Sequence, residues 1–285
     1  MIVKLQRTGG LNTGLSRKIW RRVLVVTLFA ILPLACYAQD SAADTPAAPG
    51  SLVALGRARE RVQTFFDQFS NVACTESLTQ IVMGKNGKPA YRENSAYEYQ
   101  FQASSDSGTL KVSESRNTHS PAFRDPGRTL LITNGFASLL LVVHPQYEAS
   151  YTFDAEGEES IAGTTLEKYR FSPIAGGAWP AAIRLRGRNY PLPLSGMLWI
   201  EPQTGVIVKM EAQVDSSLSD LGLSGMRSEV HYAAHTFHNP EETMWIPESA
   251  VIDVETPHQH WRNLHRFTSY KRFNVDIHEE IGQNP

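Results

Sequence analysis

The sequence predicts a mainly β fold of the α+β class: a curved antiparallel sheet forming an unclosed β-barrel, with an N-terminal helix and a short lid helix. From residue 74 onward, successive runs alternate apolar and polar side chains, the period of strands with one buried face. Short Gly-bearing turns separate the runs, as in an antiparallel meander. About ten strands in one sheet must curl, split or close. We therefore expect an apolar concave face under helical covers.

The first 38 residues have the pattern of a secretory signal peptide. Six basic and no acidic residues precede the apolar run 23–38, and Cys36 and Ala38 suit a cut before Gln39. That run is short for a membrane span, with an uncleaved anchor and lipidation at Cys36 as alternatives. We expect a periplasmic or secreted protein without a transmembrane span after cleavage, in which residues 39–50 are a Pro/Ala-rich linker and 51–285 one domain.

Loss of this segment makes the chain more acidic. It removes six of the 27 basic residues and none of the 29 acidic ones, so the net charge changes from −2 to −8. Nucleic-acid binding needs a basic surface that tracks phosphates, so we expect no nucleic-acid partner. Cys74 is then the last cysteine, which excludes an internal disulfide. We expect it to be a small buried hydrophobe rather than a reactive thiol.

The helix is expected over residues 51–72. Apolar residues recur there at steps of three and four, and polar residues fill most of the other side. Ser51 is the expected N-cap. This pattern is typical of a helix that packs on a sheet.

The strands follow in order. Alternating or apolar runs predict strands over residues 74–83, 90–103, 109–116, 147–154, 161–173, 226–238, 244–256 and 259–277. Residues 119–126, 174–193 and 216–225 are expected to be irregular. Within 129–143, the most apolar stretch of the mature chain, Asn134 and Gly135 allow a type I′ hairpin turn. The alternative, which we favour, is a short helix over 136–143 that stops before Pro145.

The strongest hairpin signal lies in residues 195–215. Pro202 suits the second position of a type I turn, and Gly205 can take the positive φ that follows it. After the turn the even positions from Val206 to Val214 are apolar, and Ile207 is the one apolar residue among the odd positions. The even positions are therefore expected to face the core.

Motifs for catalysis are missing from the sequence. It has no GxSxG, HExxH, CxxC, P-loop or GxGxxG motif. The acidic pairs at 158–159 and 241–242 lie beside turns, where solvated carboxylates are expected. Two histidine groups, 231/235/238 and 258/260/265, lack carboxylate or cysteine partners at a zinc-ligand spacing. We therefore assign no catalytic residue, no metal and no cofactor.

The hairpin also carries a family resemblance. Residues 196–202 (GMLWIEP) with Thr204-Gly205 are followed by residues 208–211 (VKME). This pattern resembles the "G-x-x-W-I-D-P-x-x-G" hairpin, followed by "I-x-K/R-x-E", of the LolA-like periplasmic outer-membrane lipoprotein carriers. Residues 244–247 (MWIP) are similar to a later "W-x-P" strand start of that family. The resemblance implies an unclosed β-barrel that holds lipid or a lipid-modified chain without catalysis. The arginine that lines the carriers' cavity has no matching position in this sequence.

These observations predict a non-catalytic protein that binds a lipid or a lipidated protein in a half-barrel. The expected ligand-binding residues are the apolar ones on the inner strand faces: Tyr97, Tyr99, Phe101, Tyr151, Phe153, Leu198, Ile200, Val208 and Met210. The alternative is a periplasmic sensor or envelope-assembly module with a filled core and a protein partner. A less favoured third hypothesis is a metal-dependent enzyme based on histidine. The volume of the cavity under the lid distinguishes the first two hypotheses: a void large enough for an acyl chain favours lipid binding, and a packed interior favours the interaction module.

Overall fold

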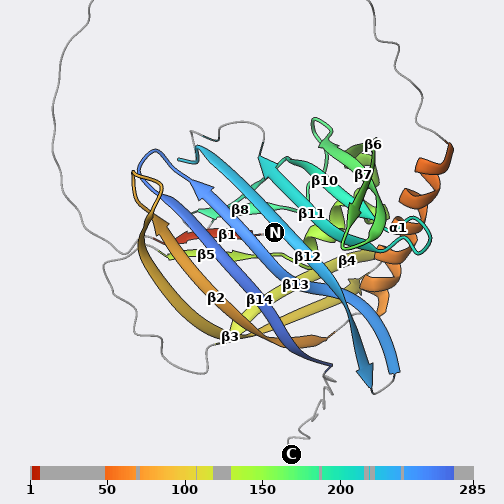
Figure 1. Cartoon of the computed structure of the whole chain (residues 1–285), viewed down its shortest axis with the longest axis horizontal. Helices are drawn as coiled ribbons and strands as arrows, with labels where there is room; N and C mark the ends of the chain where they lie inside the picture. The colour runs from red at the N-terminus through yellow and green to blue at the C-terminus, as the bar shows by residue number, and fades with distance from the viewer. Residues whose placement is uncertain are drawn as a thin grey trace, which may run out of the picture.

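The computed structural model describes residues 2–6, 49–68, 71–106, 108–117, 130–185, 188–214, 218, 222–238 and 241–272. Its largest unit is a curved antiparallel sheet, seen in Figure 1 as a trough with α1 at one end. The predicted fold class is confirmed: the chain is mainly β, the large sheet does not close into a barrel, and a helix precedes it.

The large sheet has ten strands in the order β4-β3-β2-β14-β13-β12-β11-β10-β7-β6. Their bounds are β2 Val72–Met83, β3 Pro89–Asp106, β4 Thr109–Asn117, β6 Tyr151–Ile161, β7 Thr164–Pro173, β10 Leu194–Ile200, β11 Ile207–Val214, β12 Gly225–His238, β13 Glu241–Glu255 and β14 His260–Arg272. This order departs from a simple meander, because β14 pairs with β2 and β10 pairs with β7. The first and last strands of the large sheet, β2 and β14, therefore lie side by side inside it, with β2 next to β3 and two strands from the edge strand β4.

A second, four-stranded sheet was not predicted. It has the order β5-β1-β8-β9, from β5 Leu130–Asn134, β1 Ile2–Gln6, β8 Ala182–Leu185 and β9 Arg188–Pro191. Strands β8 and β9 occupy a stretch expected to be irregular. In Figure 1 the small sheet lies behind β12 and β13, within the curve of the large sheet, where β5 contacts β14. Part of the concave side is therefore covered by β structure rather than by helix.

Helix α1 spans Pro49–Gln68, so it begins inside the predicted linker and Ser51 is not its N-cap. The helical spacing buries one side, made of Ala54, Leu55, Ala58, Val62, Phe65 and Phe66. This side contacts β3 in one half of the sheet and β10 in the other. The amphipathic helix therefore joins the two halves of the sheet at one end of the trough, and it packs on the sheet as expected.

Residues 135–150 form the second cover of the concave side of the sheet, and we call this segment the lid. The favoured helix over 136–143 exists as the 3-10 segment η1 Ser138–Val142 rather than as an α-helix. A second 3-10 segment, η2 Pro145–Ser150, occupies the start of the strand predicted over 147–154, so β6 begins only at Tyr151. All five residues of η1 are buried. Backbone bonds such as Val143 N–H to the Leu140 carbonyl close three-residue turns. The hairpin alternative is excluded, because Gly135 leads into η1 instead of a second strand.

The hairpin formed by β10 and β11 has the predicted turn but a different register at its start. Trp199 pairs with Lys209 and Ile200 with Ile207, so Val208 is the extra residue of a β-bulge. The bulge reverses the side-chain alternation. Ile207 is therefore buried with Met210, and Val208 is only partly buried. Ile207, the one apolar residue among the odd positions of this strand, is the sequence signal of the bulge.

Both glycines of the hairpin motif stand where backbones approach closely. A Cβ on Gly196 would lie 1.9 Å from the Glu211 carbonyl oxygen. A Cβ on Gly205, which has φ +70°, would lie 2.5 Å from the Arg57 carbonyl carbon. The motif therefore lets the hairpin turn touch α1.

Gly205→Ala is expected to loosen α1. The added methyl group must push Arg57 away, and we expect a loss of about 1–3 kcal/mol with faster amide exchange along α1. Gly87→Ala is the matched control, since Gly87 also has a positive φ (+72°) but nothing within 4 Å of the added Cβ. Equal losses in both variants would show that the contact with α1 contributes nothing.

Candidate functional site

The concave side of the large sheet is filled by a single hydrophobic cluster that joins α1, η1 and both halves of the sheet. Phe66 of α1 lies edge-on to His144 after η1, with ring centroids 5.7 Å apart, and 6.0 Å from Phe101 of β3. Among the described residues, this side of the sheet is therefore a packed core.

The predicted ligand-binding residues lie mostly in this core. Six of the nine are buried: Tyr99, Phe101, Tyr151, Leu198, Ile200 and Met210. Tyr97, Phe153 and Val208 are partly buried. The structure thus brings most of them into one cluster. Their role in binding stays a prediction.

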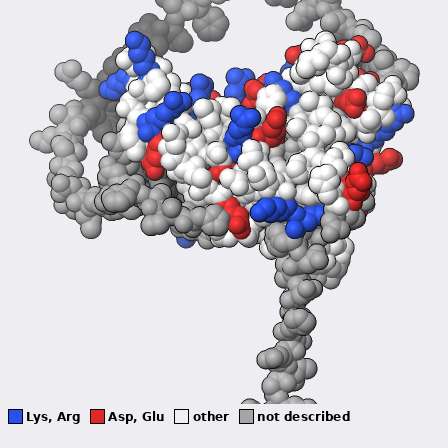
Figure 2. All heavy atoms as spheres, turned by 60° about the horizontal axis from the view of Figure 1, so that its bottom comes forward, with Lys and Arg blue, Asp and Glu red and all other residues white. Residues whose placement is uncertain are grey.

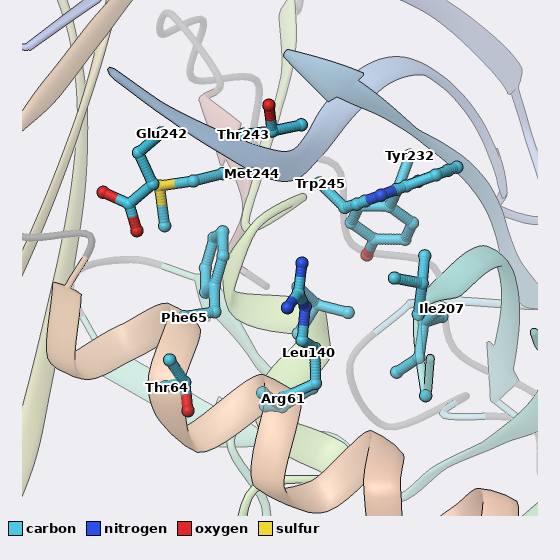
Figure 3. A pocket seen from close by; sticks show the side chains of 13 residues that line it. Arg61, Thr64, Phe65, Leu140, Ile207, Tyr232, Glu242, Thr243, Met244 and Trp245 are labelled. Atoms are coloured by element: carbon cyan, nitrogen blue, oxygen red, sulfur yellow. The ribbon is translucent and has the colours of Figure 1, made fainter. Parts of the chain in front are cut away.

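A groove remains where α1 meets the sheet, and we call it the α1 groove (Figure 3). Its cavity volume is about 70 Å³, room for a few waters and well below the roughly 300–1,000 Å³ of ligand pockets. None of the nine predicted residues lines it. The lining is Arg61, Val62, Thr64 and Phe65 of α1, Leu140 of η1, Gly205, Val206 and Ile207 at the hairpin, and Tyr232, Glu242, Thr243, Met244 and Trp245 of β12 and β13.

A charged group lies beneath the lid, and sequence reasoning did not find it. The Glu76 carboxylate of β2 accepts two hydrogen bonds from Arg116 of β4, one of them from Nη2 at 2.6 Å. It accepts a third from Nδ1 of His265 of β14, also at 2.6 Å. The side chains of Glu76 and His265 are fully buried, and that of Arg116 is 12% exposed. We call these three residues the buried charge cluster.

The environment fixes the protonation of this cluster. Burial alone would raise the pKa of Glu76, but the hydrogen bonds from His265 and Arg116 hold that pKa below its usual value. Burial lowers the pKa of His265 by more than the bond to Glu76 raises it. At neutral pH the cluster is therefore a carboxylate, a guanidinium and a neutral imidazole.

The same strand β4 also holds the start of the lid. The Glu114 carboxylate accepts hydrogen bonds from the Gly135 N–H, from the Ser138 N–H at 3.1 Å and from the Ser138 hydroxyl at 2.8 Å. Between them, the Phe136 ring lies 4.5 Å from the His265 ring and 6.0 Å from the Arg116 guanidinium. The Phe136 carbonyl accepts from the Tyr232 hydroxyl at 2.9 Å. The lid is therefore tied to β4, β12 and β14.

A sequence signal for this cluster did exist. Glu76 shares the parity of Cys74 and Leu78, Arg116 that of Leu110 and Val112, and His265 that of Trp261 and Phe267. Each is thus a polar residue at a core-facing position. A buried charge requires a partner, so such residues on different strands would have to meet.

The remaining candidates lie outside the core. His231 pairs with Glu229 and His260 with Asp253, both on partly exposed strand positions. No group of three or more metal-ligating side chains occurs among the described residues. The motif residue Trp199 lies under Lys209, whose Nζ is 4.4 Å from the indole ring, and donates from its indole N–H to Glu159 at 2.9 Å.

The reactive groups beneath the lid are engaged or held in an unreactive form. The buried charge cluster uses its polar atoms on one another and lies under the lid. Burial raises the pKa of the nearby Cys74 thiol to about 12, which disfavours the nucleophilic thiolate.

On the outer face of the sheet, charges of both signs are interspersed among uncharged residues (Figure 2). In the described part of the chain, no helix has the length and apolar character to cross a membrane.

Acid is expected to weaken the fold in two stages. The pKa of His265 is lowered from 6.5, so below about pH 6.5 the unfolded chain binds more protons than the folded one, and stability falls. The pKa of Glu76 is lowered from 4.5, which adds a second loss below about pH 4.5. The urea midpoint measured from pH 8 to 4 should show both. His265→Gln, whose amide can still donate to Glu76, should shrink the first stage without abolishing it, because burial also lowers the pKa of His144 from 6.5. A profile unchanged in His265→Gln would contradict the assignment to His265.

Known proteins offer structural neighbours only. No family model and no curated protein matches the sequence. Solved structures that are similar include a DUF1329 family protein from Desulfovibrio piger, with a TM-score of 0.43 and 10% identity over 81% of this chain and 96% of that one. A LolA superfamily protein from Nitrosomonas europaea has a TM-score of 0.38 and 10% identity over 80% and 96% of the two chains.

A third similar structure is a putative outer membrane lipoprotein-sorting protein domain from Vibrio parahaemolyticus. It has a TM-score of 0.39 and 11% identity over 79% of this chain and 94% of that one. These neighbours include the family that the hairpin motif resembles.

Proposed function

We propose that this chain is an exported, non-catalytic protein that binds a hydrophobic chain, such as a lipid or the acyl chain of a lipoprotein, between α1 and the sheet. The observation that carries this proposal is the α1 groove, which has both apolar and polar side chains in its walls and lies beside a helix. Among its walls are the buried side chains of Phe65, Ile207 and Met244, which face the groove (Figure 3).

The structure corresponds to the unloaded state in this proposal. A full acyl chain needs more room than about 70 Å³, so α1 has to move away as the ligand enters. Two polar ties that hold the helix lie near the surface: Arg57 donates to the Pro202 carbonyl at 2.7 Å, and Arg59 pairs with Glu148 at 2.7 Å. Exposed pairs of this kind contribute about 0–1 kcal/mol each.

Uptake of a fluorescent fatty acid tests the proposal. Delipidated protein is expected to bind the probe, and Met244→Arg, which puts a charge into the groove wall, is expected to weaken binding at least tenfold. Val53→Arg is the control, because Val53 lies on the exposed side of α1 (50% exposed). Failure of the wild-type protein to bind any alkyl probe would end the proposal.

The packed core favours a second candidate, an envelope sensor or assembly module that uses the groove to hold an apolar side chain of a partner protein. The small volume of the α1 groove supports this candidate, because about 70 Å³ suits a side chain better than a lipid. Mass spectrometry of the purified protein separates the two. A co-purifying lipid supports carriage, and a stable protein complex without lipid supports the module.

Export is also part of the proposal. The predicted signal peptide lies outside the described residues except for Ile2–Gln6, which forms β1. Cleavage before Gln39 would remove β1 from between β5 and β8, so the four-stranded sheet would exist only in the precursor. The N-terminal mass of the exported protein distinguishes a start at Gln39 from lipidation at Cys36 and from an intact anchor. The division into segments 1–38, 39–50 and 51–285 rests on that measurement.

A further inference from the structure

The arginines around the α1 groove differ in their partners. Arg57 and Arg59 of α1 are engaged by Pro202 and Glu148, as described above, and Arg272 pairs with Glu242 at 2.5 Å. Arg61, the remaining arginine of α1, pairs with no carboxylate among the described residues. In Figure 3 its guanidinium points away from the helix into the space between Phe65 and Ile207. A cation thus stands over the mouth of an apolar groove.

The charge at this mouth is positive. The two charged residues that line the groove are Arg61 and Glu242, and Arg272 neutralises Glu242 from outside it. The Tyr232 hydroxyl is already used on the Phe136 carbonyl, and the Thr243 hydroxyl bonds to that of Thr236 at 2.9 Å. Arg61 is therefore the strongest donor left for a ligand. A guanidinium binds carboxylate and phosphate oxygens through two parallel hydrogen bonds.

We propose that the α1 groove binds a single-chain amphiphile with an anionic head, a carboxylate or a phosphate, and that Arg61 holds this head at the mouth. This rests on the proposed function and adds the ligand's chemical class. The alkyl chain contacts Phe65, Ile207 and Met244, and the head stays at the surface beside α1. Arg61 and Phe65 are one helical turn apart, so one face of α1 contacts both parts of the ligand.

Three alkyl compounds of equal length test this inference: dodecanoate, dodecyl phosphate and dodecanol, titrated into the delipidated protein by calorimetry. We expect one or both anions to bind roughly five- to tenfold more tightly than dodecanol, with a preference that shrinks as salt rises. Arg61→Gln should remove the preference by weakening the binding of the anions far more than that of dodecanol, and Arg61→Lys should keep part of the preference. Arg266→Gln, at an exposed position of β14, makes the same change in net charge away from the groove.

The outcomes separate the two proposals. Equal affinity for dodecanol and the anions, or a preference that survives in Arg61→Gln, would overturn the role of Arg61 and leave the binding of hydrophobic chains intact. Loss of the preference in Arg266→Gln as well would show a general charge effect and would also overturn it. Absence of binding by all three compounds would refute the proposed function itself.

Discussion

Arg116→Met is expected to destabilise the fold by about 3–5 kcal/mol, because it leaves the Glu76 carboxylate buried without its cation. Methionine fills much of the space of the arginine stem, so the loss reports the charge rather than a cavity. His265 would still donate to Glu76. A neutral imidazole, however, does not compensate a buried negative charge. The measurement is the shift of the urea midpoint relative to the wild-type protein.

A double variant separates the charge from the shape. In Arg116→Met/Glu76→Gln both charges are gone and the glutamine can still accept from His265, so we expect much of the loss to be recovered. The single variant should also lose less at low pH, where Glu76 becomes protonated and no longer needs a cation. A double variant as unstable as Arg116→Met, or a loss that does not change with pH, would show that the ion pair is not what the fold requires.

The parts of the fold that follow from local periodicity were predictable. The two-residue alternation located most strands of the large sheet, and the helical spacing located α1, because burial of one face leaves a period in the sequence. The order of the strands is a different matter. The pairing of β14 with β2 joins His265 to Leu78, nearly the full length of the domain apart, and no local pattern encodes such a contact.

The site was less predictable than the fold. The alternation rule assigned inner faces correctly at Leu198 and Met210, but the bulge at Val208 exchanged it with Ile207. More importantly, the rule treats inward positions as apolar. Glu76 and His265 occupy such positions and were missed, because only the folded sheet shows that each finds its partner. The groove itself depends on where α1 lies on the sheet, which its own sequence does not specify.

Phe136→Ala is expected to release the lid at a cost of about 3–5 kcal/mol. The Phe136 side chain is fully buried and its ring lies 5.3 Å from that of Phe267 and 4.5 Å from that of His265. Its loss leaves a cavity directly over the buried charge cluster, and water that enters it would also weaken the bond between His265 and Glu76. The free energy of unfolding should therefore fall, and residues 136–143 should lose most of their protection in amide exchange.

The lid's release connects stability to binding, because Leu140 of η1 also lines the α1 groove. A loosened η1 should widen the groove, so Phe136→Ala is expected to take up a fluorescent fatty acid faster than the wild-type protein does. Tyr232→Phe is the graded comparison: it removes the bond to the Phe136 carbonyl, keeps the ring in place and should cost about 1 kcal/mol. If exchange in Phe136→Ala rises equally across β2, β14 and the lid, the lid is part of one cooperative core, and ligand entry must depend on α1 alone.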